Sequence, residues 1–326
     1  MVRALIAALT LLLCACGDPD ARAPFVESRT PPGLAARFYP PEGWAWGVVQ
    51  AERWPAQRYG VAGPAVVPRA QVLIVPGLGE SAEVWFETAN DLVGRGATVW
   101  ILDRAGQGGS GRFSGPRDVV HTPSFAPDVA GVRAMREVVI RPGSGPPFFI
   151  LASADGAVPA LLAVAAGVQV DGLILSAPRL ANNESPLPSE VAMVRLGLGQ
   201  LPAEGRRRWS REDPDGVVLG LTHDLWRGRV TGAWRLANPD LRVSGPSLGW
   251  RAAYAAASRK AERGLKSVGA PVLLLGVDPP ADATLCRGLP RCVAREFPGA
   301  GASPHLEADG VREPWLAEAK KMIFAN

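Results

Sequence analysis

The stretch from residue 148 to residue 162, FFILASADGAVPALL, constrains the fold of this chain more than any other. It opens with the apolar run 148–151, which is short enough for a buried central strand. Gly156 then supplies a small residue, and residues 157–166 are rich in the alanine and leucine of a helix. The sequence therefore predicts a strand that passes through a sharp turn into a helix packed close to it.

The register of this turn decides which side chain stands at its tip. A small-x-Ser-x-Gly pattern between strand and helix is typical of a nucleophile elbow, which lifts one side chain above a parallel sheet. The glycine stands two residues after the tip, so Gly156 places Ala154 there and Ser153 one position early. We expect Ser153 to be a turn serine that bonds to nearby backbone. The alternative is a displaced nucleophile, which would put Asp155 where the backbone requires glycine.

Bulk composition indicates a globular protein and argues against a nucleic-acid partner. The 326 residues allow one large α/β domain or two smaller ones. With 47% hydrophobic and 20% charged residues the chain can bury a sizeable core. The net charge of +4 is mild and no long Lys/Arg block occurs, so we expect no nucleic-acid partner.

Residues 1–15 have the pattern of a signal peptide. The apolar stretch 4–13 follows a basic residue and is too short to span a bilayer. It ends in LCAC, which resembles a bacterial lipobox with cleavage before Cys16 and acylation of that cysteine; an ordinary secretory signal is the alternative. Gly17 follows the cysteine where an aspartate would favour inner-membrane retention, so by analogy we expect an anchor in the outer membrane that faces the periplasm of the bacterial cell envelope.

Two further cysteines, Cys286 and Cys292, lie six residues apart. In an exported protein such a pair predicts a disulfide. We expect no metal site, because no second Cys or His pair lies nearby.

Beyond the signal, the chain divides by composition. Residues 16–43 are rich in Pro, Asp, Arg and Gly and predict a semi-extended tether. Strands then alternate with helices over 44–180 and again over 265–326, which predicts two parts of one core with a parallel sheet. This alternation of strands and helices is absent over 181–264. The predicted strands include 44–55, 56–62, 71–75, 97–102, 271–275 and 294–297.

Several motifs carry a family resemblance that covers about residues 65–326. One strand ends in PGLGE at 76–80 and the next in DRAGQGGSGR at 103–112, before the predicted elbow. This order resembles the α/β-hydrolase branch that contains lysophospholipases, monoacylglycerol lipases and serine aminopeptidases. The resemblance implies a mostly parallel central sheet flanked by helices, with 181–264 as a helical cap.

The resemblance also implies an oxyanion hole. Its donors would be the backbone N–H groups of Leu78 and Asp155, the residue after the elbow tip. Backbone donors do not depend on side-chain identity, so they say little about activity. The alternative is that PGLGE is only a turn after a strand.

The acid and the base of a catalytic triad do not match the family spacing. Asp278 and Asp282 follow a predicted strand, but the acid slot falls nearest Pro280. His305 is the only histidine in the last loop, but the histidine slot falls on Ala302. A shifted acid and base are one interpretation; turn carboxylates and a loop histidine are the other.

The predicted cap is rich in tryptophan. Its indole rings would line an apolar acyl pocket, or would pack the cap onto the core. These residues are Trp209, Trp226, Trp234 and Trp250.

We therefore expect a lipid-anchored α/β-hydrolase-fold protein of the lysophospholipase type with a degenerate triad and an apolar pocket for a lipid or acyl ligand. The alternative is an active carboxylic ester hydrolase on lysophospholipids or monoacylglycerols that uses Ser153, His305 and Asp278 or Asp282. A purely structural envelope protein is the third hypothesis. No motif predicts a cofactor, and the sequence does not specify an oligomeric state.

Overall fold

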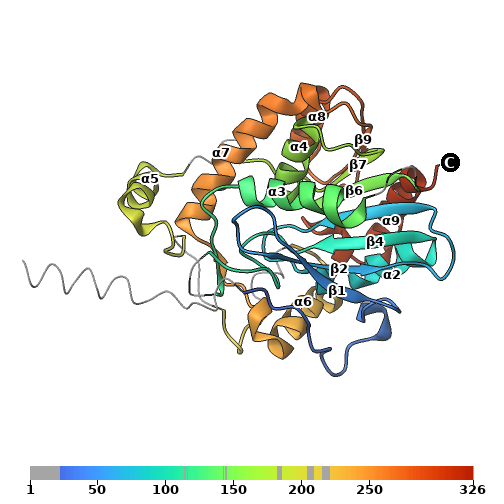
Figure 1. The fold of residues 1–326 in the computed structure, drawn as a ribbon, viewed down its shortest axis with the longest axis horizontal. Coiled ribbons are helices and arrows are strands. Elements are labelled where there is room, and N and C mark those ends of the chain that lie inside the picture. The colour runs from blue at the N-terminus through green and yellow to red at the C-terminus, as the bar shows by residue number, and fades with distance from the viewer. Residues whose placement is uncertain are drawn as a thin grey trace, which may run out of the picture.

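The computed structural model describes residues 23–113, 115, 117–141, 143, 145–181, 186–203, 209–214 and 221–325. The predicted signal peptide and Cys16 lie outside this range. The fold is a central sheet between two layers of helices (Figure 1).

Eight strands form the sheet in the order β1-β2-β4-β3-β6-β7-β9-β10. β1 pairs antiparallel with β2, and β2 with β4, whereas every other pair is parallel. The predicted mostly parallel sheet is confirmed. The strands are β1 (Ala45–Val49), β2 (Gln57–Ala62), β3 (Ala70–Val75), β4 (Ala97–Leu102), β6 (Phe148–Ser153), β7 (Gly172–Ser176), β9 (Val272–Gly276) and β10 (Cys292–Glu296). A separate parallel pair joins β5 (Val119–Val120) to β8 (Gly245–Pro246).

Alternate residues of each central strand enter different cores. In β3, Leu73 and Val75 join a core on one face, while Val72 and Ile74 join a core on the other. The first face carries α3 (Ala126–Ala134), α4 (Ala157–Ala165), α7 (Leu248–Gly264) and α8 (Pro279–Gly288), and the second carries α2 (Phe86–Gly94) and α9 (Asp309–Ile323). Burial on both faces explains why these strands are continuous apolar runs in the sequence.

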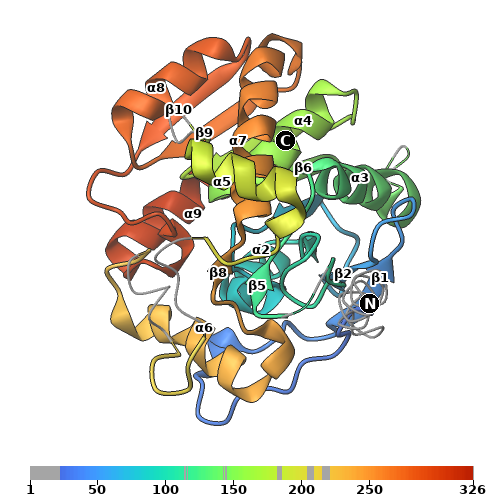
Figure 2. The same ribbon diagram turned by 90° about the vertical axis from the view of Figure 1, so that its left-hand side faces the viewer.

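The predicted cap contains two helical regions over the carboxyl edge of the sheet. One is α5 (Pro188–Met193) with the π-helical turn η6 (Val194–Leu198), and the other is α6 (Leu225–Ala237). Figure 2 views the molecule from the side on which α5 lies, and α6, β5 and β8 share that face. Helix α7, also inside the predicted cap, instead packs on α4 in the main core. Short helical turns are η2 (Ala36–Phe38), η3 (Ala82–Trp85), η4 (Met135–Ile140), η5 (Ala154–Gly156), η7 (Pro239–Leu241), η8 (Leu265–Ser267) and η9 (Pro304–Leu306).

The described part of the predicted tether, residues 23–43, lies on the body. Phe38 is buried in an apolar cluster with Trp234. The backbone of Arg29 exchanges two hydrogen bonds with the side-chain amide of Asn238, at 2.7 and 2.9 Å. A segment without periodicity has therefore packed by inserting single aromatic rings and pairing its backbone with a side chain.

The structure also bears on the predicted disulfide, on membrane-spanning helices and on metal sites. Cys286 and Cys292 form a disulfide between the end of α8 and the start of β10. Within the described ranges, no helix has the length and apolarity to cross a membrane, and no cluster of metal-ligating side chains occurs.

Candidate functional site

The turn after β6 has the geometry of an elbow, with Ala154 at its tip. The backbone of Ala154 is left-handed, at φ +47°, a conformation that costs an L-residue about 1–2 kcal/mol. Gly156 is required two residues later, because a Cβ there would lie 2.6 Å from the carbonyl oxygens of Val75 and Pro76. Strand β3 and helix α4 thus approach closely around a tip that carries only a methyl group.

Ser153, the candidate nucleophile, lies in β6 itself. Its side chain is fully buried, and its hydroxyl has no hydrogen-bond partner among the described residues. Ala154, by contrast, is partly exposed. The serine is therefore in the sheet core, and the position that meets solvent carries no hydroxyl.

One of the two predicted oxyanion-hole donors, the N–H of Leu78, already has an acceptor. The N–H of Leu78 donates to Oδ1 of Asp155 at 2.7 Å. The neighbouring N–H groups of Gly77 and Gly79 donate to the side chains of Glu80, at 2.8 Å, and Gln107, at 3.3 Å. Three consecutive backbone donors of this loop thus have internal acceptors, and the predicted donor Leu78 is one of them.

Asp155 is held in place by a buried ion network. Its Oδ2 bonds to the guanidinium of Arg104, whose Nε lies 3.5 Å from Asp128. Burial alone would lower the pKa of Arg104, but the charges of the two carboxylates outweigh it and raise that pKa. Arg104 therefore stays charged, and it holds the Asp155 carboxylate against the loop that carries Leu78.

His305, the candidate base, is enclosed in an aromatic environment. Its ring stacks on Trp85 with 3.7 Å between centroids, and it is 1% exposed. Neither ring nitrogen has a hydrogen-bond partner among the described residues. Burial, together with the charge of Arg312, holds the pKa of His305 well below its usual range. The imidazole is therefore neutral and has no bond to a serine.

The carboxylate beside His305 is one that the sequence pattern did not single out. Oε1 of Glu80 lies 3.5 Å from Nε2 of His305, without hydrogen-bond geometry, and accepts from Ser303 at 3.3 Å. Burial raises the pKa of Glu80. This contact joins residues far apart in the chain, so no local pattern predicts it. The sequence shows only that Glu80 ends the PGLGE motif after β3.

The candidate acids lie at the start of α8. Oδ2 of Asp282 accepts from the N–H of Asp278 at 2.8 Å. Burial raises the pKa of Asp282 to about 6, and the nearby carboxylate of Glu296 adds to the rise. These two residues shape the turn after β9, and the structure records no ion pair or hydrogen bond that brings either to His305 within the described ranges.

The cap tryptophans take part in packing. Trp234 contacts Phe86 at 5.5 Å between centroids, and Trp250 stacks on Tyr254 at 5.0 Å. The other two lie against Phe38 and the guanidinium of Arg242. None of Trp209, Trp226, Trp234 and Trp250 lines either hollow described below.

The larger hollow lies away from the elbow. It is an open groove of about 1210 Å³ between α3 and α7, with the end of α4 and the η6 turn also in its wall. Much of its lining is alanine, while Arg133 and Lys260 stand at opposite walls. A second hollow beside Leu78 and Ser303 has only about 10 Å³. Neither of these two, among the described residues, is lined by Ala154.

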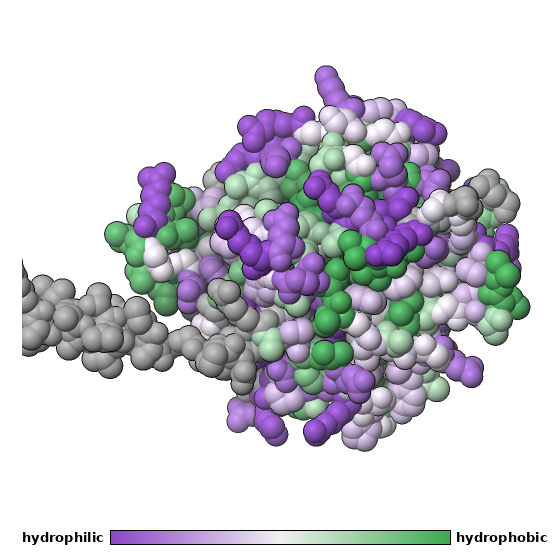
Figure 3. All heavy atoms as spheres, viewed as in Figure 1, coloured by the Kyte–Doolittle hydropathy of each residue, from purple (hydrophilic) through white to green (hydrophobic). Residues whose placement is uncertain are grey.

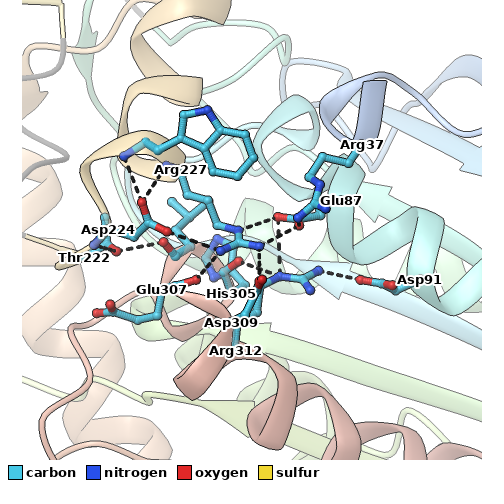
Figure 4. Close-up of polar contacts among 12 residues, drawn as sticks. Arg37, Glu87, Asp91, Thr222, Asp224, Arg227, His305, Glu307, Asp309 and Arg312 are labelled. Atoms are coloured by element: carbon cyan, nitrogen blue, oxygen red, sulfur yellow. Dashed lines mark hydrogen bonds and ion pairs between the residues drawn. The ribbon is translucent and has the colours of Figure 1, made fainter. Parts of the chain in front are cut away.

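A second buried ion network fastens α6 to the core (Figure 4). The guanidinium of Arg227 donates to both oxygens of Glu87 in α2, at 2.9 and 3.0 Å, and also to Asp309 in α9. Arg312 of α9 pairs with Asp91 and Glu87. The helix above the carboxyl edge is therefore fixed to both α2 and α9.

Comparison with known proteins adds a family and a set of related folds. Residues 67–278 match the family model described as serine aminopeptidase, S33. Over 212 residues the chain is 30% identical to lysophospholipase L2 of Escherichia coli, a match that covers 63% of this chain and 62% of that protein. The chain thus matches less than two thirds of the relative's length.

Solved structures resemble the whole body. A soluble variant of monoglyceride lipase from Saccharomyces cerevisiae superposes with a TM-score of 0.69 at 17% identity, over 90% of this chain and 98% of that one. A thermostable carboxyl esterase from Bacillus coagulans gives 0.67 at 16% identity, over 86% and 99%. At such identities the likeness concerns the fold.

Proposed function

Because the chain belongs to the serine aminopeptidase (S33) family of the α/β-hydrolase fold, we propose that it is a member in which ester hydrolysis has been lost and lipid binding retained. One observation carries the proposal. The elbow tip is Ala154, and the oxyanion donor of Leu78 is bonded to the carboxylate of Asp155. Acyl transfer needs an activated nucleophile and two free oxyanion donors; here the tip has no hydroxyl and one of the two predicted donors is engaged.

The expected loss in reaction rate supports this proposal over slow residual catalysis. Removal of the nucleophile from a serine hydrolase costs about 10⁶ in rate, and the residual activity rests on the oxyanion hole and on substrate binding. Here the oxyanion donor is also engaged, by an anion that would repel a developing oxyanion. The alternative hydrolase would need Ser153 bonded to His305, and neither group has a hydrogen-bond partner among the described residues.

The groove between α3 and α7 is the place we propose for the ligand. Its volume of about 1210 Å³ exceeds the usual range of about 300–1,000 Å³ for small-molecule sites. Alanine-rich walls provide an apolar surface. Arg133 and Lys260 are matched in the lining by Glu52 and Glu137, so charges of both signs are available to a zwitterionic head group. A single-chain lipid, the class named in the relative lysophospholipase L2, matches both features.

We further propose that the mature chain is anchored by an acylated Cys16 in the outer membrane, on its periplasmic side. The sequence LCAC at the end of a short apolar segment supports this. Several acyl chains on one residue would hold the protein far more firmly than a single chain.

The loss of hydrolysis is tested with a fluorophosphonate probe. We expect no labelling of the wild-type protein and none of Ser153→Ala, with both shown to be folded by circular dichroism. Labelling of the wild type that disappears in Ser153→Ala would establish a serine hydrolase and refute the proposal.

Ligand binding is tested by displacement of dansyl-labelled undecanoic acid with lysophosphatidylethanolamine. Ala256→Trp fills the groove from α7 and is expected to weaken binding of both lipids. The matched control is Ala283→Trp on α8, which is also exposed but lies outside the groove. Equal binding by the two variants would place the ligand elsewhere.

A further inference from the structure

An apolar surface that no described part of the chain covers lies on residues 186–201, which we call the leucine flap. The flap comprises α5, the η6 turn and the residues beside them, and it projects from the body in Figure 1. Figure 3 shows the same projection with its hydrophobic residues in green. Four of its leucines are exposed, and Leu196 keeps 77% of its surface in water. The exposed leucines are Leu187, Leu196, Leu198 and Leu201.

The flap is fastened at its base, so the leucines cannot fold away without breaking hydrogen bonds. The carbonyls of Gly199 and Leu201 accept from the start of α7, at 2.7 and 2.9 Å. Glu190 pairs with Arg251 of α7 at 2.7 Å. A contiguous apolar patch held rigidly in solvent is unusual for a monomeric soluble protein and marks a surface that meets a partner or a membrane.

The described chain begins on the same edge of the molecule as the flap. The N–H of Phe25 donates to Gly109, at 2.7 Å, in the loop that follows β4. The flap follows β7, and β4 and β7 belong to the parallel part of the sheet, whose carboxyl ends share one edge. The flap and the first described residues therefore lie at the carboxyl edge.

The length of chain before Phe25 limits how the body can face a membrane. Cys16 precedes Phe25 by nine residues, which reach at most about 30 Å when fully extended. A compact body of 326 residues has a radius of gyration of about 20 Å and so a diameter of about 50 Å. An anchored chain therefore keeps the carboxyl edge near the bilayer.

From these observations we infer that the leucine flap docks on the lipid bilayer and buries its exposed leucines in the interfacial region. Arg195, an exposed residue of the η6 turn, adds attraction to anionic lipid head groups. Val194 and Gly197 of the flap also line the groove, so a lipid that leaves the bilayer at the flap has a direct route into it. This inference rests on the proposed anchor at Cys16.

The experiment uses the full mature chain reconstituted in vesicles of phosphatidylethanolamine and phosphatidylglycerol. An environment-sensitive fluorophore is attached at Leu196→Cys. The control fluorophore is at Val67→Cys, which is 85% exposed and precedes β3 at the opposite edge of the sheet. Sedimentation reports retention on the vesicles, and lipids brominated in their acyl chains report contact through quenching.

Three outcomes separate the possibilities. Docking predicts that the protein sediments and that the fluorophore at residue 196 shifts to the blue and is quenched several-fold more than the one at residue 67. Sedimentation with equal quenching at both positions overturns docking and leaves the anchor standing. A protein that stays in the supernatant refutes the anchor. It overturns docking as well, because the leucines then do not bind the bilayer.

Discussion

The carboxylate of Asp155 and the backbone N–H of Leu78, 77 residues apart in sequence, are joined by a hydrogen bond of 2.7 Å. In an active enzyme of this fold that N–H would be free to stabilise the oxyanion of the reaction. Here it donates to a resident carboxylate, and the hydrogen bond joins the loop after β3 to the turn after β6.

The first prediction concerns the stability that this hydrogen bond provides. Asp155→Ala leaves the buried Arg104 with one weaker partner, and we expect the free energy of unfolding to fall by about 3 kcal/mol. Asp155→Asn keeps an oxygen that accepts from Leu78 but turns its NH2 group toward Arg104 and removes the charge, so we expect a similar loss of about 3 kcal/mol. Urea unfolding measures both variants.

A matched control is Asp213→Ala, at an exposed carboxylate, which we expect to change the free energy of unfolding by less than about 0.5 kcal/mol. If Asp155→Ala were as mild as this control, Asp155 would not be held in the network described.

The second prediction follows from the left-handed backbone at Ala154, φ +47°. Glycine adopts this conformation without a clash of its own Cβ, so we expect Ala154→Gly to raise the free energy of unfolding by about 1 kcal/mol. In the same turn Ala157 is helical, at φ −58°, and Ala157→Gly is expected to lower it by about 1 kcal/mol or more. A loss of stability in both variants, measured by thermal unfolding, would contradict a strained elbow.

Short-range patterns were sufficient to predict the architecture. Apolar runs such as β6 and β9 are buried on both faces, which makes them recognisable without any partner. Gly156 alone fixed the elbow register, because close approach of β3 excludes every larger residue there. The likeness to α/β-hydrolases extended the same inference to a mostly parallel sheet flanked by helices.

The details of the site depend on contacts that no local pattern encodes. The sequence predicted a role for the backbone N–H of Asp155. The hydrogen bond from the N–H of Leu78 to the Asp155 carboxylate depends on the packing of β3 against β6 and was not predicted. The stacking of His305 on Trp85 likewise joins distant loops. Residues 23–43 lack periodicity in the same way as a true tether, so only the packed structure reveals their contacts with the body.

The third prediction is a pH dependence caused by His305. The pKa of its imidazole is well below the usual value in the folded protein, and near 6.5 in the unfolded chain. Below pH 6.5 the unfolded state therefore takes up a proton that the folded state does not, and stability falls as pH falls. We expect the wild type to lose about 1 kcal/mol more than His305→Phe between pH 7.5 and 5.5.

The Phe variant keeps the stack on Trp85. The charged groups that face His305 are Glu80 and Arg312, and both are present in the wild type and in the variant. Burial raises the pKa of Glu80, which gives a stability change of opposite sign as pH falls. Urea unfolding across this pH range separates the two effects by difference. Parallel curves for wild type and variant would show that His305 is not buried in its neutral form.

The last prediction concerns the attachment of α6. Arg227 is buried and bonded to both oxygens of Glu87, so its replacement removes two charge-assisted hydrogen bonds of that carboxylate and leaves it only the longer contacts with Arg37 and Arg312. We expect Arg227→Met to lower the free energy of unfolding by about 3 kcal/mol. Arg227→Lys keeps the charge but loses the paired geometry, and we expect an intermediate loss.

The control is Arg229→Met, two residues along the same helix, where the side chain is exposed. We expect that variant to stay within about 0.5 kcal/mol of the wild type. Because Arg227 also bonds to Asp309 in α9, its loss frees α6 from two elements at once. Hydrogen exchange in α6 should then rise ahead of exchange in the sheet. Equal exchange in Arg227→Met and Arg229→Met would mean that aromatic packing around Trp234, and not this ion network, holds α6 in place.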